Sequence, residues 1–243
     1  MQRVNERPAA DQVAVVASSD PGGGSMAHLA VGNGWASTIE LINSGATPAQ
    51  VHVKFFGDDG SPLPIALTVS GTATTSSAVD QTLAPHARLV IQSTGIESDP
   101  LQVGAVQLTS DGTVSGFIRF RYGARGQEAS VPVQSRNAGA YLLVFDNTAG
   151  LTSEVAVANV SGVAATVPVV IRNNTGSQIG SGSIELPPNG HSAFALTDLF
   201  SATANQSGTV EFDTPSGGLI SVLGVRLTAL GTFSTIPVVV PQY

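Results

Sequence analysis

The residues best suited to acid–base or metal chemistry in this chain are its four histidines: His28, His52, His86 and His191. A metal site that can be recognised from sequence usually has ligands at short spacing, because such spacing brings two side chains to one face of an element. These histidines stand far apart along the chain. We therefore expect isolated histidines on the surface and in turns.

Two close acidic pairs could bind calcium or act as paired catalytic carboxylates. The first opens the run Asp58-Asp59-Gly60, and the second is Glu97 with Asp99. Carboxylates suit Ca²⁺, but the further spaced acids of a calcium loop are missing. Asp and Gly are also typical of tight turns. We therefore interpret residues 58–60 as a turn and residues 97–99 as a solvated loop, and we expect no metal and no cofactor.

Motifs that mark a catalytic nucleophile are missing from the sequence. There is no Gly-x-Ser-x-Gly elbow, no phosphate-binding glycine loop and no cysteine. The lack of cysteine also excludes disulfides and thiolate metal sites. We therefore predict that the chain has no catalytic site and is not an enzyme.

Trp35 and Tyr122 could form a platform for a sugar, because an aromatic face suits a pyranose ring. An internal alignment, described below, pairs Trp35 with Leu151 and Tyr122 with Leu227. Positions that accept either an aromatic residue or leucine are typical of a hydrophobic core or its edge. Two interpretations of Trp35 therefore stay open: an aromatic that faces a ligand, or a residue at the edge of the core.

The segments that must position these side chains are predicted to be short β-strands. Val51, Val53 and Phe55 alternate with polar residues, which is the period of a strand with one buried face. Turn residues recur at intervals of about 8–12 residues, the spacing expected of a β-sandwich. Long helical periodicity is absent from the sequence.

The chain also contains an internal repeat. Residues 42–61 align without gaps on residues 158–177, at an offset of 116. Residues 114–132 align on residues 219–237, at an offset of 105. Between these blocks, residues 83–85 align on residues 186–188 at an offset of 103. The fall in offset from 116 to 103 corresponds to an insert at residues 70–81 of the first copy. Blocks in the same order indicate a duplication.

We therefore predict an all-β fold of two tandem immunoglobulin-like antiparallel β-sandwich domains related by internal duplication. The first repeat would comprise residues 27–135 and the second residues 139–243. Residues 1–26 would form an N-terminal extension. In this alignment Arg121 is the equivalent of Arg226, and we expect a structural role for both.

Composition limits the partners and the location of the chain. Hydrophobic residues make up 42% of the 243 residues, enough for two cores, and charged residues only 11%. The net charge of -7 argues against a nucleic-acid partner, which requires a basic face. No apolar run approaches the roughly 18 residues of a membrane span, and no signal peptide is visible. The scarcity of lysine and the many Ser, Thr and Gly residues favour an extracellular or cell-surface location.

Several strand and turn motifs resemble those of a known group of proteins. The motifs are Gly32-Asn33-Gly34-Trp35, the run from Phe55 to Leu63, Phe145-Asp146-Asn147 and the run from Leu186 to His191. Over residues 27–243 they resemble the tandem β-sandwich repeats of large bacterial surface and secreted proteins. The resemblance implies the fold and export. It supplies no catalytic residues, because these repeats are generally uncharacterised.

The N-terminal extension contains a short strand-like run, followed by a glycine-rich spacer. The run consists of Val13, Ala14, Val15, Val16 and Ala17. It precedes the first repeat at about the distance at which the last strand of that repeat precedes the second. Such a strand could add to a sheet edge of its own chain or of another copy. The alternative interpretation is a floppy linker.

Together these observations favour a non-enzymatic extracellular structural protein. It would be a surface stalk, or a self-assembling subunit whose partners are copies of itself. Head-to-tail addition of the N-terminal strand would give a filament unless a rotation closes the ring. The alternative is an adhesion module that binds a surface glycan or a matrix protein.

Deletion of residues 1–24 tests the assembly hypothesis. We expect the intact chain to form oligomers and the truncated chain to be monomeric, because main-chain hydrogen bonds of the added strand would supply much of the affinity. Light scattering coupled to size-exclusion chromatography measures both. A truncated chain that assembles as before, or an intact monomer, contradicts the hypothesis and leaves the stalk interpretation.

Overall fold

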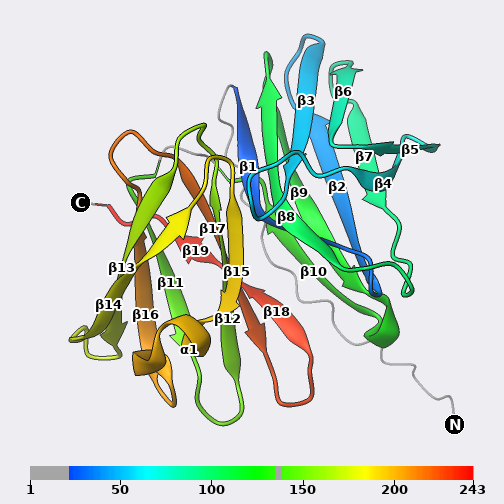
Figure 1. Cartoon of the computed structure of the whole chain (residues 1–243). Coiled ribbons are helices and arrows are strands. Elements are labelled where there is room, and N and C mark those ends of the chain that lie inside the picture. Colours follow the sequence, from blue (N-terminus) through cyan, green and yellow to red (C-terminus); the bar gives the residue numbers. More distant parts are fainter. Residues whose placement is uncertain (1–21, 135–137, 243) are drawn as a thin grey trace, which may run out of the picture.

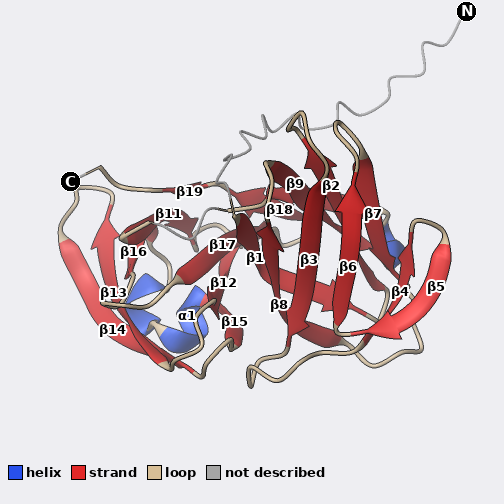
Figure 2. Cartoon of the chain, turned by 90° about the horizontal axis from the view of Figure 1, so that it is seen from above, coloured by secondary structure: helices blue, strands red, loops and turns tan. Residues whose placement is uncertain are grey.

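The computed structural model describes residues 22–134 and 138–242, which form antiparallel sheets with little helix (Figure 1). Four sheets pack as two pairs, and each pair encloses a hydrophobic core. Figure 2 shows the two sandwiches side by side, with β1 (Gly23–Val31) and β17 (Ile220–Leu227) where they meet. The predicted all-β sandwich class is confirmed. The strand predicted at residues 13–17 lies outside the described residues.

The first sandwich pairs a sheet of order β1-β8-β3-β6 with a sheet of order β10-β9-β2-β7-β4-β5. A short 3-10 turn, Gly123–Arg125, connects β9 to β10. The strands after β1 are β2 (Trp35–Asn43), β3 (Ala49–Phe56), β4 (Ile65–Val69), β5 (Thr72–Ser76), β6 (Ala78–Leu83), β7 (Arg88–Ser93), β8 (Gln102–Ser110), β9 (Val114–Tyr122) and β10 (Gln127–Pro132).

The second sandwich pairs a sheet of order β14-β13-β16-β11-β19 with a sheet of order β15-β12-β17-β18. One helical turn, α1 (Leu196–Leu199), and a 3-10 turn, Ser201–Thr203, follow β15. Besides β17, the strands are β11 (Ala140–Asp146), β12 (Thr152–Asn159), β13 (Ala165–Asn173), β14 (Gln178–Leu186), β15 (His191–Ala195), β16 (Ser207–Asp213), β18 (Phe233–Ile236) and β19 (Val238–Val239).

The alternation seen in the sequence decides which face of each strand is buried. On β3, Val51, Val53 and Phe55 are at most 1% exposed, and the polar residues between them are exposed. On β13 the same face is buried. Burial of such side chains stabilises each core by about 1.5–3 kcal/mol per large apolar residue.

Strand order is the same in the two sandwiches. β1-β8-β3-β6 corresponds to β11-β16-β13-β14, and β10-β9-β2-β7 corresponds to β18-β17-β12-β15. Ladder registers correspond as well: Phe55 lies opposite Val106, and Ile171, which aligns with Phe55, lies opposite Val210. β4 and β5 have no counterpart in the second sandwich, and β19 has none in the first. β5 lies within the predicted insert, residues 70–81. This correspondence is expected of a duplication. The duplication itself and the domain limits remain predictions.

The sequence alignment is wrong by one residue in β9 and β17. It pairs Arg121 with Arg226, but Arg121 lies opposite Ala36 in its ladder. Thr152, which aligns with Ala36, lies opposite Leu227. Because side chains alternate along a strand, a shift of one residue exchanges the two faces of the sheet. Arg121 and Arg226 are therefore not structural equivalents.

A buried asparagine fixes the end of β2. Asn43 is 0% exposed. Its Nδ2 donates to the carbonyl oxygens of Thr47 and Leu83 at 2.8 and 3.0 Å, and its Oδ1 accepts from the backbone N–H of Gly45 at 2.9 Å. The side chain thus satisfies backbone groups of two loops that would otherwise be buried without partners.

Asn159, which aligns with Asn43, does the same at the end of β12. It is also 0% exposed, and its Nδ2 donates to the carbonyl oxygens of Val163 and Pro187 at 2.7 and 2.8 Å. Its Oδ1 accepts from the backbone N–H of Ser161. Both sandwiches therefore use the same polar side chain to join the same two loops.

We predict that Asn43→Asp and Asn159→Asp each lower the free energy of unfolding by roughly 2–4 kcal/mol, because each removes donors and buries a charge. Asn174→Asp, at an exposed turn position, is the matched control and should change it by less than about 0.5 kcal/mol. Urea unfolding at neutral pH measures all three. Equal effects at the three positions contradict this role.

Candidate functional site

The two sandwiches meet along one face of the sheet β15-β12-β17-β18. We call the contact between the two sandwiches the seam. β1 lies across this face and contacts β12, β15 and β17. On β12, Val155 and Val157 belong to the second core, whereas Ala156 packs into the first. Leu223 of β17 also packs into the first core. The small side chain of Ala156 lets the backbones of β1 and β12 approach closely.

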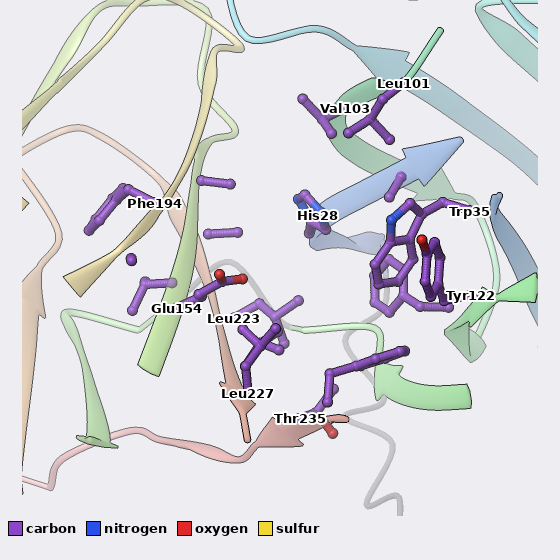
Figure 3. Close-up of a pocket in the computed structure, with 18 of the residues that line it drawn as sticks. His28, Trp35, Leu101, Val103, Tyr122, Glu154, Phe194, Leu223, Leu227 and Thr235 are labelled. Atoms are coloured by element: carbon purple, nitrogen blue, oxygen red, sulfur yellow. The ribbon is translucent and has the colours of Figure 1, made fainter. Parts of the chain in front are cut away.

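An open cavity of about 650 Å³ lies at the seam, a size typical of small-molecule sites (Figure 3). Both sandwiches contribute to its lining. The aliphatic and aromatic lining includes Leu101, Val103, Phe120, Leu223, Val225 and Leu227. The polar side chains of the lining include His28, Glu154 and Arg125.

Trp35, interpreted from the sequence either as an aromatic that faces a ligand or as a residue at the edge of the core, lines this cavity. Its ring is partly buried and lies 4.9 Å from the ring of Tyr122 and 5.1 Å from that of Phe233, between ring centroids. Phe233 belongs to the second sandwich, so the aromatic cluster crosses the seam. Much of the indole surface is thus already in aromatic contact, which reduces the area left for stacking on a sugar.

A chain of hydrogen bonds crosses the seam from the turn after β3. Asp58 Oδ1 lies 2.7 Å from His191 Nδ1, and His191 Nε2 lies 3.0 Å from His28 Nδ1. The backbone N–H of His191 also donates to the Asp58 carbonyl oxygen. The histidine ring centroids lie 5.1 Å apart. The chain therefore passes from the first sandwich to the second and back.

His28 and His191 are held neutral at pH 7. Burial, with a smaller contribution from the nearby His191, lowers the pKa of His28 to about 3. Burial also lowers the pKa of His191, against the opposite effects of the hydrogen bond to Asp58 and its charge. One set of neutral tautomers satisfies both bonds: His191 Nδ1–H donates to Asp58, and His28 Nδ1–H donates to His191 Nε2.

Glu154 of β12 is the acidic group of the cavity. It is half-buried, and its carboxyl group points into the cavity (Figure 3). Burial raises the pKa of Glu154, and the negative charge of Asp198 raises it further. Within the described residues the carboxyl group has neither a hydrogen bond nor an ion pair. Arg125, also in the lining, instead donates to the Leu230 carbonyl oxygen.

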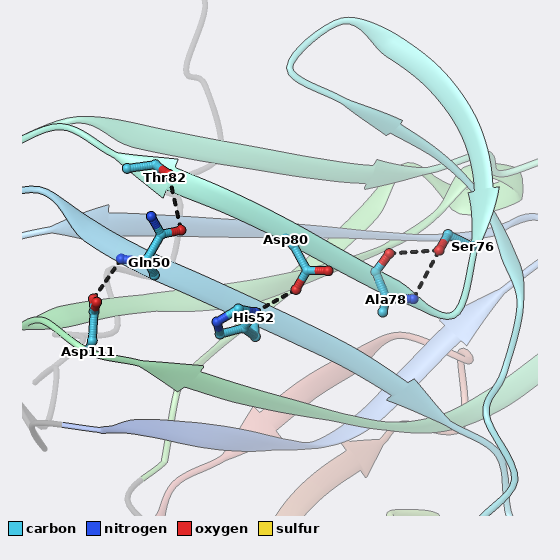
Figure 4. Close-up of polar contacts among 7 residues, drawn as sticks. All are labelled: Gln50, His52, Ser76, Ala78, Asp80, Thr82 and Asp111. Atoms are coloured by element: carbon cyan, nitrogen blue, oxygen red, sulfur yellow. Dashed lines mark hydrogen bonds and ion pairs between the residues drawn. The ribbon is translucent and has the colours of Figure 1, made fainter.

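The expectation of isolated histidines is right for two and wrong for two. His52 is exposed and pairs with Asp80 at 2.6 Å on the outer face of the first sandwich (Figure 4). His86 is exposed in a turn. His28 and His191 instead meet although 163 residues separate them. Nothing in their sequence spacing indicates this contact.

The acidic pairs behave largely as interpreted. Asp59 accepts from the backbone N–H and the hydroxyl of Ser61, which closes the predicted turn and lowers the pKa of Asp59. Glu97 lies in an exposed loop. Over the described ranges, no cluster of three or more His, Cys, Asp or Glu side chains could hold a metal ion. The contact of Asp58 with His191, 133 residues away, was missed.

Among the described residues, no helix has the length and apolar character needed to cross a membrane.

Comparisons with known proteins leave the family open. No protein family matches the sequence, and no curated protein matches it either. One similar solved structure is "Biofilm associated protein - BSP domain", at 9% identity and a TM-score of 0.22 over 87% of this chain and 55% of that one. Another is "anti-sigma factor domain-containing protein", at 11% identity and a TM-score of 0.16 over 82% and 81%. The chain spans about half the length of the first.

We predict that acid weakens the fold through the buried histidines. Between pH 7 and 5 the unfolded chain takes up a proton at each histidine near pH 6.5, but folded His28 does so only near pH 3. The free energy of unfolding should therefore decrease as the pH is lowered. The decrease is up to about 1.4 kcal/mol per pH unit for each histidine whose folded pKa is lowered.

His28→Gln should reduce the slope of the unfolding free energy against pH. His52→Gln, at the exposed histidine, should leave that slope unchanged. Urea unfolding at several pH values measures the slope. An unchanged slope in His28→Gln contradicts the assignment.

Proposed function

We propose that the chain is a non-enzymatic structural module of an extracellular surface assembly, in which the two sandwiches act as one rigid unit. The observation that carries this proposal is the continuous contact along the seam. A stalk or spacer transmits position only if its domains keep a fixed orientation. Domains joined by a linker alone move relative to each other.

Apolar contacts support a fixed orientation. Ala156 and Leu223 of the second sandwich pack into the core of the first. Elsewhere on the seam, Ala105 of β8 and Ala158 of β12 are buried in one small cluster. Phe233 adds an aromatic contact with Trp35. Separation of the sandwiches would expose all of these groups to water, which is unfavourable.

The segment after β10 also holds the two sandwiches together. The backbone of Gln134 pairs with Ser25 of β1, with two hydrogen bonds of 2.9 Å. The Gln134 side chain donates to the Val222 carbonyl oxygen at 2.7 Å and accepts from the Ser221 hydroxyl at 2.6 Å. One residue therefore bonds to strands of both sandwiches.

A structural role also agrees with the environment of the buried histidines. Within the described residues, the hydrogen bonds of His28 and His191 run to each other and to Asp58, not to a serine or threonine hydroxyl. Activation of a serine or threonine nucleophile would need such a hydroxyl. The composition, poor in charge and rich in Ser, Thr and Gly, supports an extracellular location.

Self-assembly is the finer form of this proposal, with other copies of the chain as partners. β5 and β14 each end a sheet, so one side of each strand lacks a ladder partner within the described residues. Such edges can accept an added strand, which is the role predicted for residues 13–17. The alternative, a module that binds a glycan or a matrix protein, is favoured by the seam cavity and by the place of Trp35 in it.

Distance measurements test the rigid unit. The chain has no cysteine, so Thr74→Cys on β5 and Ser183→Cys on β14 can be spin-labelled without competing thiols. We expect one narrow distance distribution by pulsed electron paramagnetic resonance, because the seam fixes the orientation. Gln134→Ala should broaden it, since backbone groups of Val222 lose their partners.

Gln81→Ala, on the exposed side of β6, is the matched control and should leave the distribution narrow. A broad distribution in the otherwise unaltered chain overturns the proposal.

A further inference from the structure

We propose that the seam cavity binds an apolar primary amine, with its ammonium group beside Glu154 and His28 and its hydrocarbon part against the apolar lining. This assignment goes beyond the structural function proposed above and does not depend on it. It stands on the volume of the cavity, the acceptors that reach it and the charge around it.

The volume and lining suit a hydrocarbon group. A cavity of about 650 Å³ lies within the range of small-molecule sites, which are mostly apolar with a few convergent polar groups. Val103, Leu223 and Val225 contribute aliphatic surface, and Phe120 contributes an aromatic edge. Ala193 of β15 is exposed in the lining, so the cavity is open to solvent on this side.

The first acceptor is the Glu154 carboxylate. It points into the cavity and is without a partner in the described part of the chain (Figure 3). Its pKa is raised by burial and by Asp198, as expected for a carboxylate that lacks a counter-ion. A cationic ligand would supply the missing charge.

The second acceptor is Nε2 of His28. In the tautomers that satisfy the chain from Asp58, His28 Nδ1 carries the proton and Nε2 carries a lone pair. His28 lines the cavity, and its Nε2 has no hydrogen-bond partner among the described residues. In this tautomer the Nε2 lone pair can accept a hydrogen bond. An ammonium group has three N–H donors, so it can donate to more than one acceptor.

The charges of the lining favour a cation over an anion. Glu154 and Asp198 are acidic, His28 is neutral, and Arg125 is basic. The Arg125 guanidinium donates to the Leu230 carbonyl oxygen, so it is already engaged by the loop before β18. Within the described residues, no three or more His, Cys, Asp or Glu side chains gather to hold a bare metal ion. An amine needs only the two acceptors and an apolar surface.

Three probes of one skeleton test the proposal: 4-phenylbutylamine, 4-phenylbutan-1-ol and 4-phenylbutyrate. Trp35 is the only tryptophan of the chain and lines the cavity, so its fluorescence reports occupancy directly. We expect the amine to change Trp35 emission saturably. The alcohol should bind about tenfold more weakly, the effect of losing a hydrogen-bonded charge pair, and the carboxylate more weakly still.

Two substitutions test separately the contribution of the Glu154 charge and that of the cavity volume. Glu154→Gln should abolish the preference for the amine over the alcohol. Glu185→Gln, on β14 and hydrogen-bonded to Thr166, is the matched control and should retain it. Ala193→Leu should weaken the binding of both the amine and the alcohol, because the larger side chain fills part of the cavity. Unchanged circular dichroism and thermal unfolding show that each variant is folded.

The outcomes decide the proposal. A preference for the amine that is lost only in Glu154→Gln supports it. Equal binding of amine and alcohol, insensitive to Glu154→Gln, overturns it, as does the absence of binding by any probe. A Trp35 emission that changes with protein concentration alone shows that a second copy covers the cavity, and also overturns it. None of these results bears on the rigidity measured with the spin labels.

Discussion

The close approach of β1 to Ala156 of β12 is the contact on which the rest of the seam depends. Because Ala156 has only a methyl group, β1 can lie near enough for Leu223 to enter the first core. A larger side chain there would force the backbones apart, and overpacking of this kind costs about 1–3 kcal/mol. The same approach brings His191 within hydrogen-bonding distance of His28.

The polar groups drawn into the seam by this approach are compensated unequally. Asp58, His191 and His28 form a continuous chain, and neutral histidines avoid the penalty of a buried charge. Gln134 satisfies backbone groups of β17. Glu154 receives no such compensation in the described residues, and its raised pKa reflects that. The seam and the cavity can thus arise from one contact, because the small side chains that allow β1 to dock also leave space beside it.

Local and distant interactions differ in how far they could be predicted. The strands of the first sandwich follow from alternation on β3 and from turn residues such as Asp59, whose side chain bonds two residues ahead. The class of fold was therefore predictable, and the resemblance to bacterial surface repeats pointed the same way. The register of β9 and β17 was not, because a shift of one residue changes the alignment very little but exchanges the faces. Trp35 was selected because it is an aromatic residue, but its contact with Phe233 could not be predicted from the sequence.

The sequence by itself determined that the chain forms short strands, that these bury one face, and that the two halves share a pattern of strands and turns. These properties depend on neighbours in the chain, so spacing and residue type encode them. Only the tertiary structure decided which outer faces meet. Alanines at a docking face look the same in sequence as alanines facing water, and the groups that meet at the seam, such as Asp58 and His191, stand 133 residues apart. The candidate site exists only where two such faces meet, which is why no local motif marks it.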